Sequence, residues 1–550
     1  MFPSRRIDLL VLAFVCFAAF WWQLGALGLI DPDEPFYAQT AREMVHSGDW
    51  LTPRIYGAPQ FEKPILYYWL LGSSFRELGE TESSGRLPTA VFATALTLLT
   101  WAFGSRVWNR RAGFCAALAL ATGLEFCVMS RLMLTDVPLA VFFTGAVYAY
   151  WRATQKEERR NLWIFIHFVC TGLAVLTKGP IGSLVPLMAT VCYSLTTRRP
   201  LLFRGPGFWW GLGAYAAIVL PWYGLMFAQH GQQFWEEFFV RDNFLRMIRA
   251  EHPANNHFWY YPGLLFLGSI PWMPAVALTL RRSWSRWRAD DGAWFQWCWL
   301  LTSLVFLTLA QSKLPSYAFY LFVPLALLVG RTLDDFLERG FLGSGERRMT
   351  IGLCIAQCVC PLAAAIAPLL SGALFLKGIR PFEAPVIFLS APLAVSLLFL
   401  FRGQFRVWLL FNGAASVAFL AGALTLARAA VEAESSARPV AEALARLRQG
   451  DEPLLSGKFL ARGIIYYTGG SVSIIAKNAQ PFWAAHPLPI ILWKKGLQEF
   501  MASHPTALCT LRKSEWESLK DEDAFKDREA FDIIGENVVV RARGTMTKPE

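Results

Sequence analysis

The feature that most constrains this chain is a succession of apolar stretches, most of them about 17 to 25 residues long, within residues 1–427. Hydrophobic residues make up 55% of the 550 residues and charged residues 17%, and the mean hydropathy is +0.36. These values are typical of polytopic membrane proteins and not of soluble domains. We therefore predict a polytopic α-helical membrane protein with about thirteen transmembrane helices. The predicted helices are Ile7–Gly28, Leu87–Val107, Ala112–Ser130, Val137–Tyr150, Leu162–Thr177, Ser183–Leu195, Phe208–Phe227, Tyr260–Leu280, Ala293–Ala310, Tyr317–Gly330, Thr350–Gly372, Pro385–Phe401 and Val407–Ala427.

The basic residues, which give the chain a net charge of +11, occur in short groups between these stretches. They form no continuous basic stripe, so we predict no nucleic-acid binding. Every alternate loop is basic, as at Arg5–Arg6, Arg106–Arg111, Arg152–Arg160 and Arg281–Arg288, and basic loops lie on the cytoplasmic side of membrane proteins. The pattern predicts a cytoplasmic N-terminus and, after an odd number of helices, a C-terminal segment outside the cytoplasm.

Residues 428–550 differ in character from the rest of the chain. Their apolar runs have the length of strands and alternate with polar, helix-like patterns such as Ala437–Arg448. We predict a soluble α/β domain here, after a transmembrane domain at 1–427 with large outward loops at 29–86 and 228–259. The predicted strands are Pro453–Ser456, Val472–Ala476, Leu488–Leu492, Ala507–Leu511 and Val538–Arg541.

The stretch Asp31–Pro64 is the most acidic segment near the N-terminus and follows the first apolar stretch directly. Carboxylates at a bilayer edge are costly to desolvate, so they face bulk water or serve a site. Asp33 and Glu34 therefore have two interpretations. They belong to a catalytic loop, or they simply begin a helix that Asp31 or Asp33 caps.

Single charged residues recur in the other outward loops, where lysine and arginine are expected to be depleted. Each basic residue stands at a predicted helix end, and two of the four, Lys63 and Lys178, are directly followed by Pro or Gly. Snorkelling to lipid headgroups explains any one of them, but their shared side favours an anionic phosphate group as ligand. These residues are Glu62 and Lys63 in FEKP, Arg131 and Asp136 in SRLMLTDVP, Lys178 in LTKGP, and Lys313 in QSKLPSY.

The outward loop at 228–259 contains three of the seven histidines, His230, His252 and His257. The simplest interpretation is that these histidines are surface residues. One of them, paired with Glu62, would alternatively supply the nitrogen and oxygen ligands that zinc accepts. The loop has no internal metal-ligand spacing.

Six motifs occur in an order that resembles bacterial lipid A aminoarabinose transferases. They are DPDEPFYAQTAREM, FEKP, SRLMLTDVPL, LTKGP, FWYYP with a downstream PW, and SKLPSY. The chain is thus similar to the broader family of polyprenyl-phosphate-dependent glycosyltransferases with the membrane GT-C fold, which includes protein O-mannosyltransferases. The motifs cover most of the membrane part of the chain. Pro35-Phe36 stands where the aminoarabinose enzymes carry a basic residue, and this leaves the sugar and the acceptor open.

The resemblance implies roles for particular residues. Asp33, with Glu34 beside it, would be the catalytic acidic residue of the first loop, and Asp136 the second acidic residue of the site. Lys63, Lys178 and Tyr317 would hold the lipid phosphate, and we add Arg131 and Lys313 as further donors to it. Glu62 would bind a divalent metal (Zn, Mg or Mn) together with His252 or His257.

The resulting prediction is an inverting glycosyltransferase that moves a monosaccharide from a polyprenyl (undecaprenyl) phosphate donor to lipid A or another envelope lipid or glycan. The lipid bilayer and these substrates are the expected partners, the chain is expected to be a monomer, and the expected location is the bacterial inner membrane, with the site on the periplasmic side. Two alternatives stay open. One is protein O-glycosylation by the same fold, and the other is a transporter or flippase for a lipid-linked sugar.

Overall fold

The computed structural model describes residues 4–155, 159–199, 201–202, 204–283, 289–371, 383–479, 487–526 and 531–543. Contacts divide the chain into two compact units. The membrane unit consists of residues 1–24, 61–70 and 86–423, and the second unit of residues 25–60, 71–85 and 424–550. The stretch Asp31–Pro64 is therefore shared between the units.

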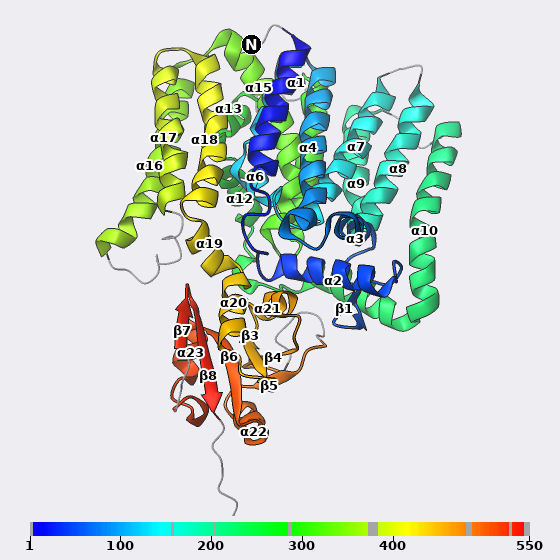
Figure 1. The fold of residues 1–550 in the computed structure, drawn as a ribbon. Coiled ribbons are helices and arrows are strands. Elements are labelled where there is room, and N and C mark those ends of the chain that lie inside the picture. The colour runs from blue at the N-terminus through cyan, green and yellow to red at the C-terminus, as the bar shows by residue number, and fades with distance from the viewer. Residues whose placement is uncertain are drawn as a thin grey trace, which may run out of the picture. The chain divides into compact units, whose positions relative to one another are not determined.

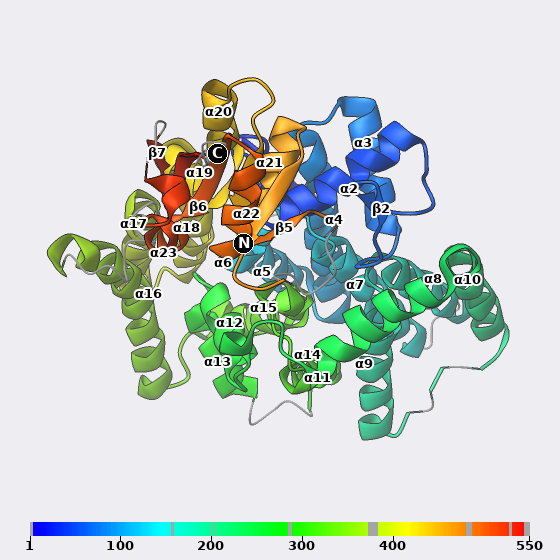
Figure 2. The ribbon, with the colours of Figure 1, turned by 90° about the horizontal axis from the view of Figure 1, so that it is seen from below.

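The membrane unit is built from helices (Figure 1). Helices α7, α8, α9 and α10 form one group and lie side by side in both views (Figures 1 and 2), and α5 packs along α15. The bounds of its helices are α1 Arg5–Cys16, α4 Glu82–Val107, α5 Arg110–Ala121, α6 Leu124–Met129, α7 Asp136–Thr154, α8 Arg160–Lys178, α9 Ile181–Thr197, α10 Pro206–Phe234, α11 Arg246–Ile248, α12 Tyr260–Gly268, α13 Met273–Ser283, α14 Asp291–Leu309, α15 Phe322–Arg339, α16 Ser344–Ser371, α17 Glu383–Phe401 and α18 Phe405–Thr425. Two π-helices, η1 Phe17–Trp21 and η2 Trp235–Leu245, and two 3-10 helices, η3 Pro253–Asn255 and η4 Pro315–Leu321, complete it.

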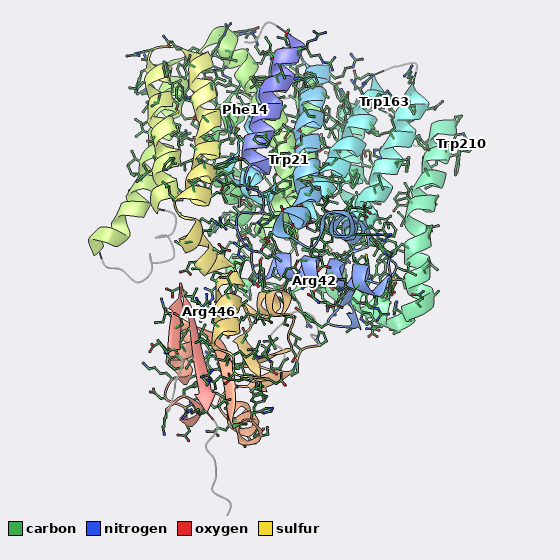
Figure 3. All side chains as sticks on the ribbon, in the orientation of Figure 1. Phe14, Trp21, Arg42, Trp163, Trp210 and Arg446 are labelled. Carbon is green, nitrogen blue, oxygen red and sulfur yellow. The ribbon has the colours of Figure 1, made fainter. Side chains whose placement is uncertain are left out.

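Six helices among the described residues are long and apolar enough to cross a membrane, or seven if the bent pair α12–α13 is one span. Large apolar side chains on several of these helices are exposed. Trp210 lies on the outer edge of α10 and is 74% exposed (Figure 3), which suits contact with lipid and not with water. The chain is a multi-pass membrane protein, while the predicted number of thirteen helices stays a prediction.

Several predicted spans are interrupted in the structure. The stretch predicted as Ala112–Ser130 divides into α5 and α6 around Thr122 and Gly123. The stretch predicted as Tyr260–Leu280 bends by 119° between α12 and α13, beside Pro271, whose ring cannot continue a helix. An apolar run gives the length of a span but not such a break within it. The end of the span predicted at Thr350–Gly372, and the basic residues Lys156, Arg286 and Arg288, lie outside the described residues.

The region predicted as a long outward loop at 228–259 is mostly helical. Helix α10 continues to Phe234 through a kink at Gly231 (φ 46°), and the π-helix η2 and α11 follow without a break. Only residues 249–259, which contain the short η3, are irregular. The many polar residues of this region, which suggested a loop, are placed on helical turns near the end of a span.

The second unit contains α2 Asp33–Ser47, the short strands β1 Arg54–Ile55 and β2 Ala58–Pro59, and the C-terminal part of α3 Leu66–Leu78. Its remaining helices are α19 Arg428–Ser435, α20 Arg438–Leu447, α21 Ala461–Thr468, α22 Lys495–Ser503, α23 Lys513–Leu519 and the 3-10 helix η6 Asp523–Phe525. Its sheet consists of β3 Leu454–Gly457, β4 Val472–Ala476, β5 Ile490–Leu492, β6 Thr506–Arg512, β7 Phe531–Ile534 and β8 Asn537–Arg543. The predicted α/β domain is present, with all five predicted strands and with β7 in addition.

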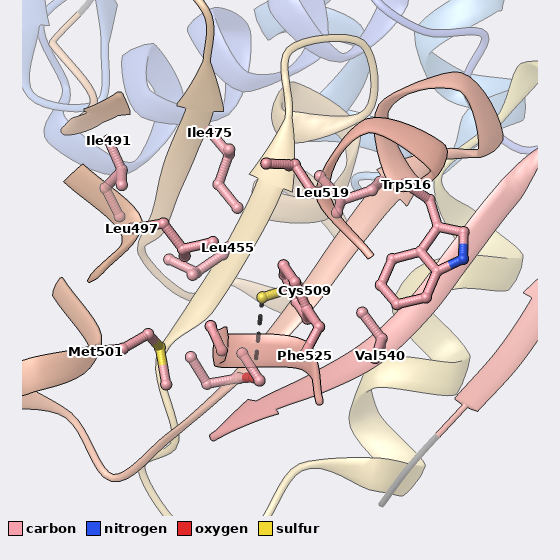
Figure 4. Close-up of a cluster of buried hydrophobic side chains, with 14 of the residues drawn as sticks. Leu455, Ile475, Ile491, Leu497, Met501, Cys509, Trp516, Leu519, Phe525 and Val540 are labelled. Carbon is pink, nitrogen blue, oxygen red and sulfur yellow. Dashed lines mark hydrogen bonds between the residues drawn. The ribbon is translucent and has the colours of Figure 1, made fainter. Parts of the chain in front are cut away.

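The strands form one sheet in the order β5-β4-β3-β6-β8-β7. The first four strands of this order pair in parallel, and β8 is antiparallel to β6 and β7. Alternate residues of each strand face opposite sides, so Leu455 packs with α22 and α23 (Figure 4) while Leu454 packs with α20 and α21. Both faces of the sheet are covered, as expected for parallel strands.

Asp31 connects the start of α2 with the C-terminal part of the chain inside the second unit. Its carboxylate is buried and accepts hydrogen bonds from the backbone N–H of Ala437 at 2.8 Å and of Gly463 at 3.0 Å. Its own N–H donates to the carbonyl of Ser435. Asp31 therefore does not cap α2. The interpretation of Asp31 as the cap of this helix is wrong. Residues 25–60 and 71–85, which the sequence analysis assigned to the transmembrane domain, pack instead with residues 424–550.

Candidate functional site

A cavity of about 180 Å³ opens in the membrane unit where the residues after β2, the end of α8, η2, α11 and η4 meet. One part of its wall carries three cations and two carboxylates, and the other part is apolar. Its lining residues are Glu62, Lys63, Leu139, Lys178, Pro180, Ile181, Leu184, Asp242, Asn243, Arg246, Met247, Phe306, Leu307, Ala310, Ser312, Tyr317 and Tyr320. Four of the predicted site residues thus come together here: Glu62, Lys63, Lys178 and Tyr317.

Lys178 reaches the cavity because α8 ends with this residue. Gly179 follows with φ 87°, a conformation that favours glycine, and a Cβ on it would lie 2.8 Å from the Phe238 ring. The Lys178 ammonium donates to the Asp136 carboxylate at 2.5 Å and lies 4.8 Å from the centre of the Tyr317 ring. Asp136 is the first residue of α7, where the helix dipole favours a carboxylate.

Arg246 holds the opposite part of the polar wall together. Its guanidinium donates to the Tyr317 hydroxyl at 2.9 Å and pairs with Asp242 at 3.2 Å and Glu251 at 3.6 Å. Asp242 also accepts from Arg241 at 2.7 Å. Tyr317 thus lies between the two cations Lys178 and Arg246, one on its ring and one on its hydroxyl.

Lys63 follows Glu62 in the segment that links β2 to α3. Its ammonium donates to the Glu62 carbonyl oxygen at 3.0 Å. Desolvation lowers the pKa of Lys63, and the charges of Arg246 and Lys178 lower it further, while Glu62 and Asp242 oppose this effect. A lysine whose charge is disfavoured in this way gains from an incoming anion.

Two other predicted phosphate ligands have different partners. Arg131 is buried and donates to the carbonyl oxygens of Ala19, Trp22 and Gln23 at 2.7–3.0 Å, where the first helix ends. Lys313 is 1% exposed and donates to the Asn256 side chain at 2.7 Å and the Ala310 carbonyl at 2.6 Å. Both side chains satisfy freed backbone groups, as expected beside helix breaks, and neither lines the cavity. The geometry gives their predicted contact with the donor no support.

The histidines predicted as metal ligands do not line the cavity either. His252 and His257 are exposed, and the His257 ring stacks on Trp259 with 5.1 Å between ring centres. His230 is the loop histidine that lies next to the Glu62 segment, since its ring centre is 5.0 Å from that of Phe61. Within the described residues, no group of three or more His, Cys, Asp or Glu side chains is placed to hold a metal ion.

The two acidic residues of the first loop belong to the second unit. Asp33 is the exposed first residue of α2. Glu34 is 1% exposed, and its carboxylate accepts from the backbone N–H of Ile30 at 2.7 Å. Glu34 therefore has a structural hydrogen bond and is buried, whereas Asp33 is exposed.

Asp242 and Arg246 are the site residues that the sequence analysis missed. They lie one helical turn apart in a region that looked like a polar loop, and their pairing follows from the i, i+4 spacing. A helical interpretation of WEEFFVRDNFLRMI would have placed both on one face.

Comparison with known proteins places this arrangement in context. The family model for dolichyl-phosphate-mannose-protein mannosyltransferases matches residues 9–236. An undecaprenyl phosphate-α-4-amino-4-deoxy-L-arabinose arabinosyl transferase of Erwinia tasmaniensis is 29% identical over 307 residues, which is 55% of either chain. A corresponding protein of Sodalis glossinidius is 30% identical over 369 residues, or 64% of either chain. The matches thus span only about half to two thirds of these relatives.

Among solved structures, ArnT from Cupriavidus metallidurans bound to undecaprenyl phosphate matches with a TM-score of 0.75 and 21% identity, over 99% of both chains. The apo state of the same protein matches equally well. The resemblance that the six motifs indicated is confirmed, and the chain is a membrane protein with the GT-C glycosyltransferase fold of ArnT.

Proposed function

We propose that this protein transfers a monosaccharide, with inversion, from undecaprenyl phosphate to an acceptor lipid or glycan of the bacterial envelope, such as lipid A. The observation that carries the proposal is the cavity in which Lys63, Lys178 and Arg246 adjoin an apolar wall of Leu, Ile, Met and Phe side chains. A polyprenyl phosphate has the same division into an anionic head and an apolar chain. The names of the relatives support this substrate class.

The leaving group of such a donor is a lipid phosphate on which charge develops as the sugar bond breaks. Cations held in a desolvated cavity stabilise that charge without reorganising. Lys63, Lys178 and Arg246 would bind the phosphate oxygens, and Asp136 would hold the Lys178 ammonium in position. Tyr317, fixed by Arg246, would donate its hydroxyl hydrogen or shape the edge of the site.

Asp33 is the proposed group that acts on the acceptor. If the acceptor is a hydroxyl, the exposed Asp33 carboxylate is the general base. If the acceptor is a phosphate, which is already ionised, Asp33 orients it. Glu34 does not share this role in the proposal, because its carboxylate is buried and accepts the Ile30 N–H.

A divalent metal at Glu62 is a separate proposal. Glu62 lines the cavity, but His252 and His257 do not, and the described residues contain no three-ligand cluster. The residues therefore do not fit a metal site with three protein ligands, and no step of the reaction is assigned to a metal. Full turnover in the presence of EDTA would exclude the metal, and loss of turnover that zinc restores would support it.

The location proposed for the site is the periplasmic face of the inner membrane. The alternation of basic loops carries this orientation. Cysteine substitution at Asp33 in an otherwise cysteine-free variant tests it, because a membrane-impermeant maleimide added to spheroplasts should label that position. If the position is labelled only after the membrane is permeabilised, the site faces the cytoplasm and the proposed orientation is wrong.

The decisive experiment is mass spectrometry of envelope lipids and glycans with and without the gene, which should show the loss of one sugar mass. Purified protein in proteoliposomes should then form the glycosidic bond and release undecaprenyl phosphate, and Asp33→Asn should abolish this while leaving donor binding intact. Movement of the lipid-linked sugar across the bilayer without a new glycosidic bond would instead support a flippase. Loss of sugar from peptides and not from lipids would support the protein O-glycosyltransferase that the family model's name suggests.

A further inference from the structure

The second unit contains a cleft that the transfer reaction does not use. It has a volume of about 350 Å³ and lies at the carboxyl ends of the parallel strands of the C-terminal sheet. Its lining residues are Lys458, Ile475, Ala476, Lys477, Asn478, Trp493, Ser514 and Glu515.

The position of this cleft follows from the strand order. The chain begins at β3, moves outward to β4 and β5, and returns to the other side of β3 as β6. The connections therefore diverge between β3 and β6, and open α/β sheets bind ligands outside the carboxyl ends of the strands at such a point. The residue directly after β3 is Lys458, the residue after β4 is Lys477, and the residue after β5 is Trp493.

The polar groups of the cleft are mostly hydrogen-bond donors. Lys458 and Lys477 are exposed, and the Lys477 ammonium lies 4.4 Å from the centre of the Trp493 ring. The indole N–H of Trp493 is buried and has no hydrogen-bond partner among the described residues. Because this N–H has no accessible surface, the two lysines are the donors that a ligand in the cleft can reach.

Glu515 is the acidic residue of the cleft. Its carboxylate accepts the backbone N–H of Arg512 at 2.9 Å. Burial raises the pKa of Glu515, while the Arg512 N–H and the charges of Arg512 and Lys477 oppose this. A carboxylate beside two lysines suits a ligand that carries both an anionic group and hydroxyl groups.

A second, small cavity shares Glu515 with the cleft and has a volume of about 10 Å³, room for about one water. Thr510 and Asn537 line it, each with a buried side-chain oxygen that has no hydrogen-bond partner in the described part of the chain. One bound water would satisfy both oxygens, so this cavity completes the polar floor beside the cleft.

We propose that this cleft binds a phosphorylated saccharide, with its phosphate held by Lys458 and Lys477 and a sugar hydroxyl held by Glu515. The same measure gives about 10 Å³ for the small cavity with room for about one water, so a cleft of about 350 Å³ accommodates a sugar ring in addition to the phosphate. The phosphate part of the assignment depends on the cleft alone. The saccharide part rests on the proposed transferase function.

The test is isothermal titration of the purified full-length protein with glucose 1-phosphate. Saturable binding is expected, with weaker competition by inorganic phosphate and none by glucose. Lys458→Gln combined with Lys477→Gln should weaken binding at least tenfold, since two charge-assisted contacts are lost.

The matched control is Lys494→Gln combined with Lys495→Gln. These two lysines follow Trp493 directly, but their side chains are 66% and 88% exposed and do not line the cleft. The control makes the same change of charge in the same domain and should bind glucose 1-phosphate like the unmodified protein. The proposal is wrong if glucose 1-phosphate does not bind at millimolar concentration, or if both double variants bind it equally.

A second arm identifies the natural source of the ligand. Vesicles that contain a phosphorylated glycolipid should displace glucose 1-phosphate if the cleft binds a lipid headgroup, and should fail to displace it if the ligand is a soluble sugar phosphate. Either result supports the cleft as the binding site. Donor turnover, measured separately on the unmodified protein, distinguishes failure of the cleft from failure of the transferase: an inactive enzyme that binds glucose 1-phosphate refutes only the proposed function.

Discussion

Replacement of Lys63 by Met is the sharpest test of how the cavity recognises its donor. Met has nearly the length of lysine but no charge, so Lys63→Met removes one contact to the donor phosphate and keeps the packing. A hydrogen bond to a charged group contributes about 1.5–3 kcal/mol, and about 1.4 kcal/mol corresponds to a tenfold change in affinity. Because part of this energy offsets the cost of burying the ammonium, we expect undecaprenyl phosphate to bind roughly tenfold more weakly.

The stability of the variant should change in the opposite direction. Desolvation and the neighbouring cations lower the pKa of Lys63, which means that folding disfavours its charged form. Removal of the charge should therefore leave the unfolding temperature unchanged or raise it. Native mass spectrometry of the protein in detergent measures the donor affinity, and a thermal-shift assay of the same samples measures the unfolding.

Lys313→Met is the matched control. Lys313 is also a lysine in an outward segment, but it bonds to Asn256 and Ala310 and does not line the cavity. This variant should lose stability, because two partly buried acceptors lose their donor, and should bind the lipid donor as before. Unchanged donor affinity in Lys63→Met, or a larger loss of affinity in Lys313→Met, would refute the assignment of the cavity as the phosphate site.

The remaining predictions concern charges whose partners the structure defines. Asp136→Asn should destabilise the protein by about 3 kcal/mol, since Lys178 is then left as a buried cation without its carboxylate, and Lys178→Met added to it should restore part of the thermal stability. Arg246→Met should raise the KM for the donor by roughly tenfold or more, as both the Arg246 charge and the position of Tyr317 are lost; an unchanged KM would contradict this. Asp31→Ala should lower the free energy of unfolding by about 2 kcal/mol or more, because two backbone N–H groups lose their acceptor, and proteolysis of the second unit should accelerate accordingly. Donor affinity should fall as the pH rises through the lowered pKa of Lys63, because the ammonium loses its charge. Between that pKa and the ordinary pKa of lysine, Lys63 makes the free energy of unfolding rise with pH. Lys63→Met should flatten the pH dependence of donor binding.

The sequence predicted which segments form strands and apolar helices better than it predicted where a helix bends or is interrupted. The five predicted C-terminal strands are all present, because alternating apolar residues and short runs are local signals. The bend between α12 and α13 was missed, since it depends on how the chain packs around Pro271 and not on local hydropathy. The helical region Trp235–Ile248 was missed for the opposite reason, because its charged residues looked like a solvated loop although they form ion pairs on helical turns.

The candidate site was predicted in part. Lys63 and Lys178 were found because each is a cation at a predicted helix end in an outward segment, and Tyr317 was found through the family resemblance of the six motifs. Arg131 and Lys313 are also cations at predicted helix ends but satisfy backbone carbonyls. The pattern therefore identifies basic residues at helix ends. It does not distinguish residues that bind a ligand from residues that donate hydrogen bonds to the backbone carbonyls freed at the break.

The carboxylates of the cavity change the argument about its charge. The outward cations alone suggested a positive site for phosphate, yet Lys63, Lys178 and Arg246 are matched in number by Glu62 and Asp242 in the wall together with Asp136 beside Lys178. Asp136 and Asp242 each pair directly with a cation. A phosphate cannot bind here by net charge alone. It must compete with Asp136 for Lys178 and with Asp242 for Arg246, so the head group gains specificity from geometry, while the apolar wall supplies much of the affinity. A donor with a shortened prenyl chain should accordingly bind more weakly for each buried prenyl unit that is removed. Raised ionic strength should weaken donor binding only slightly.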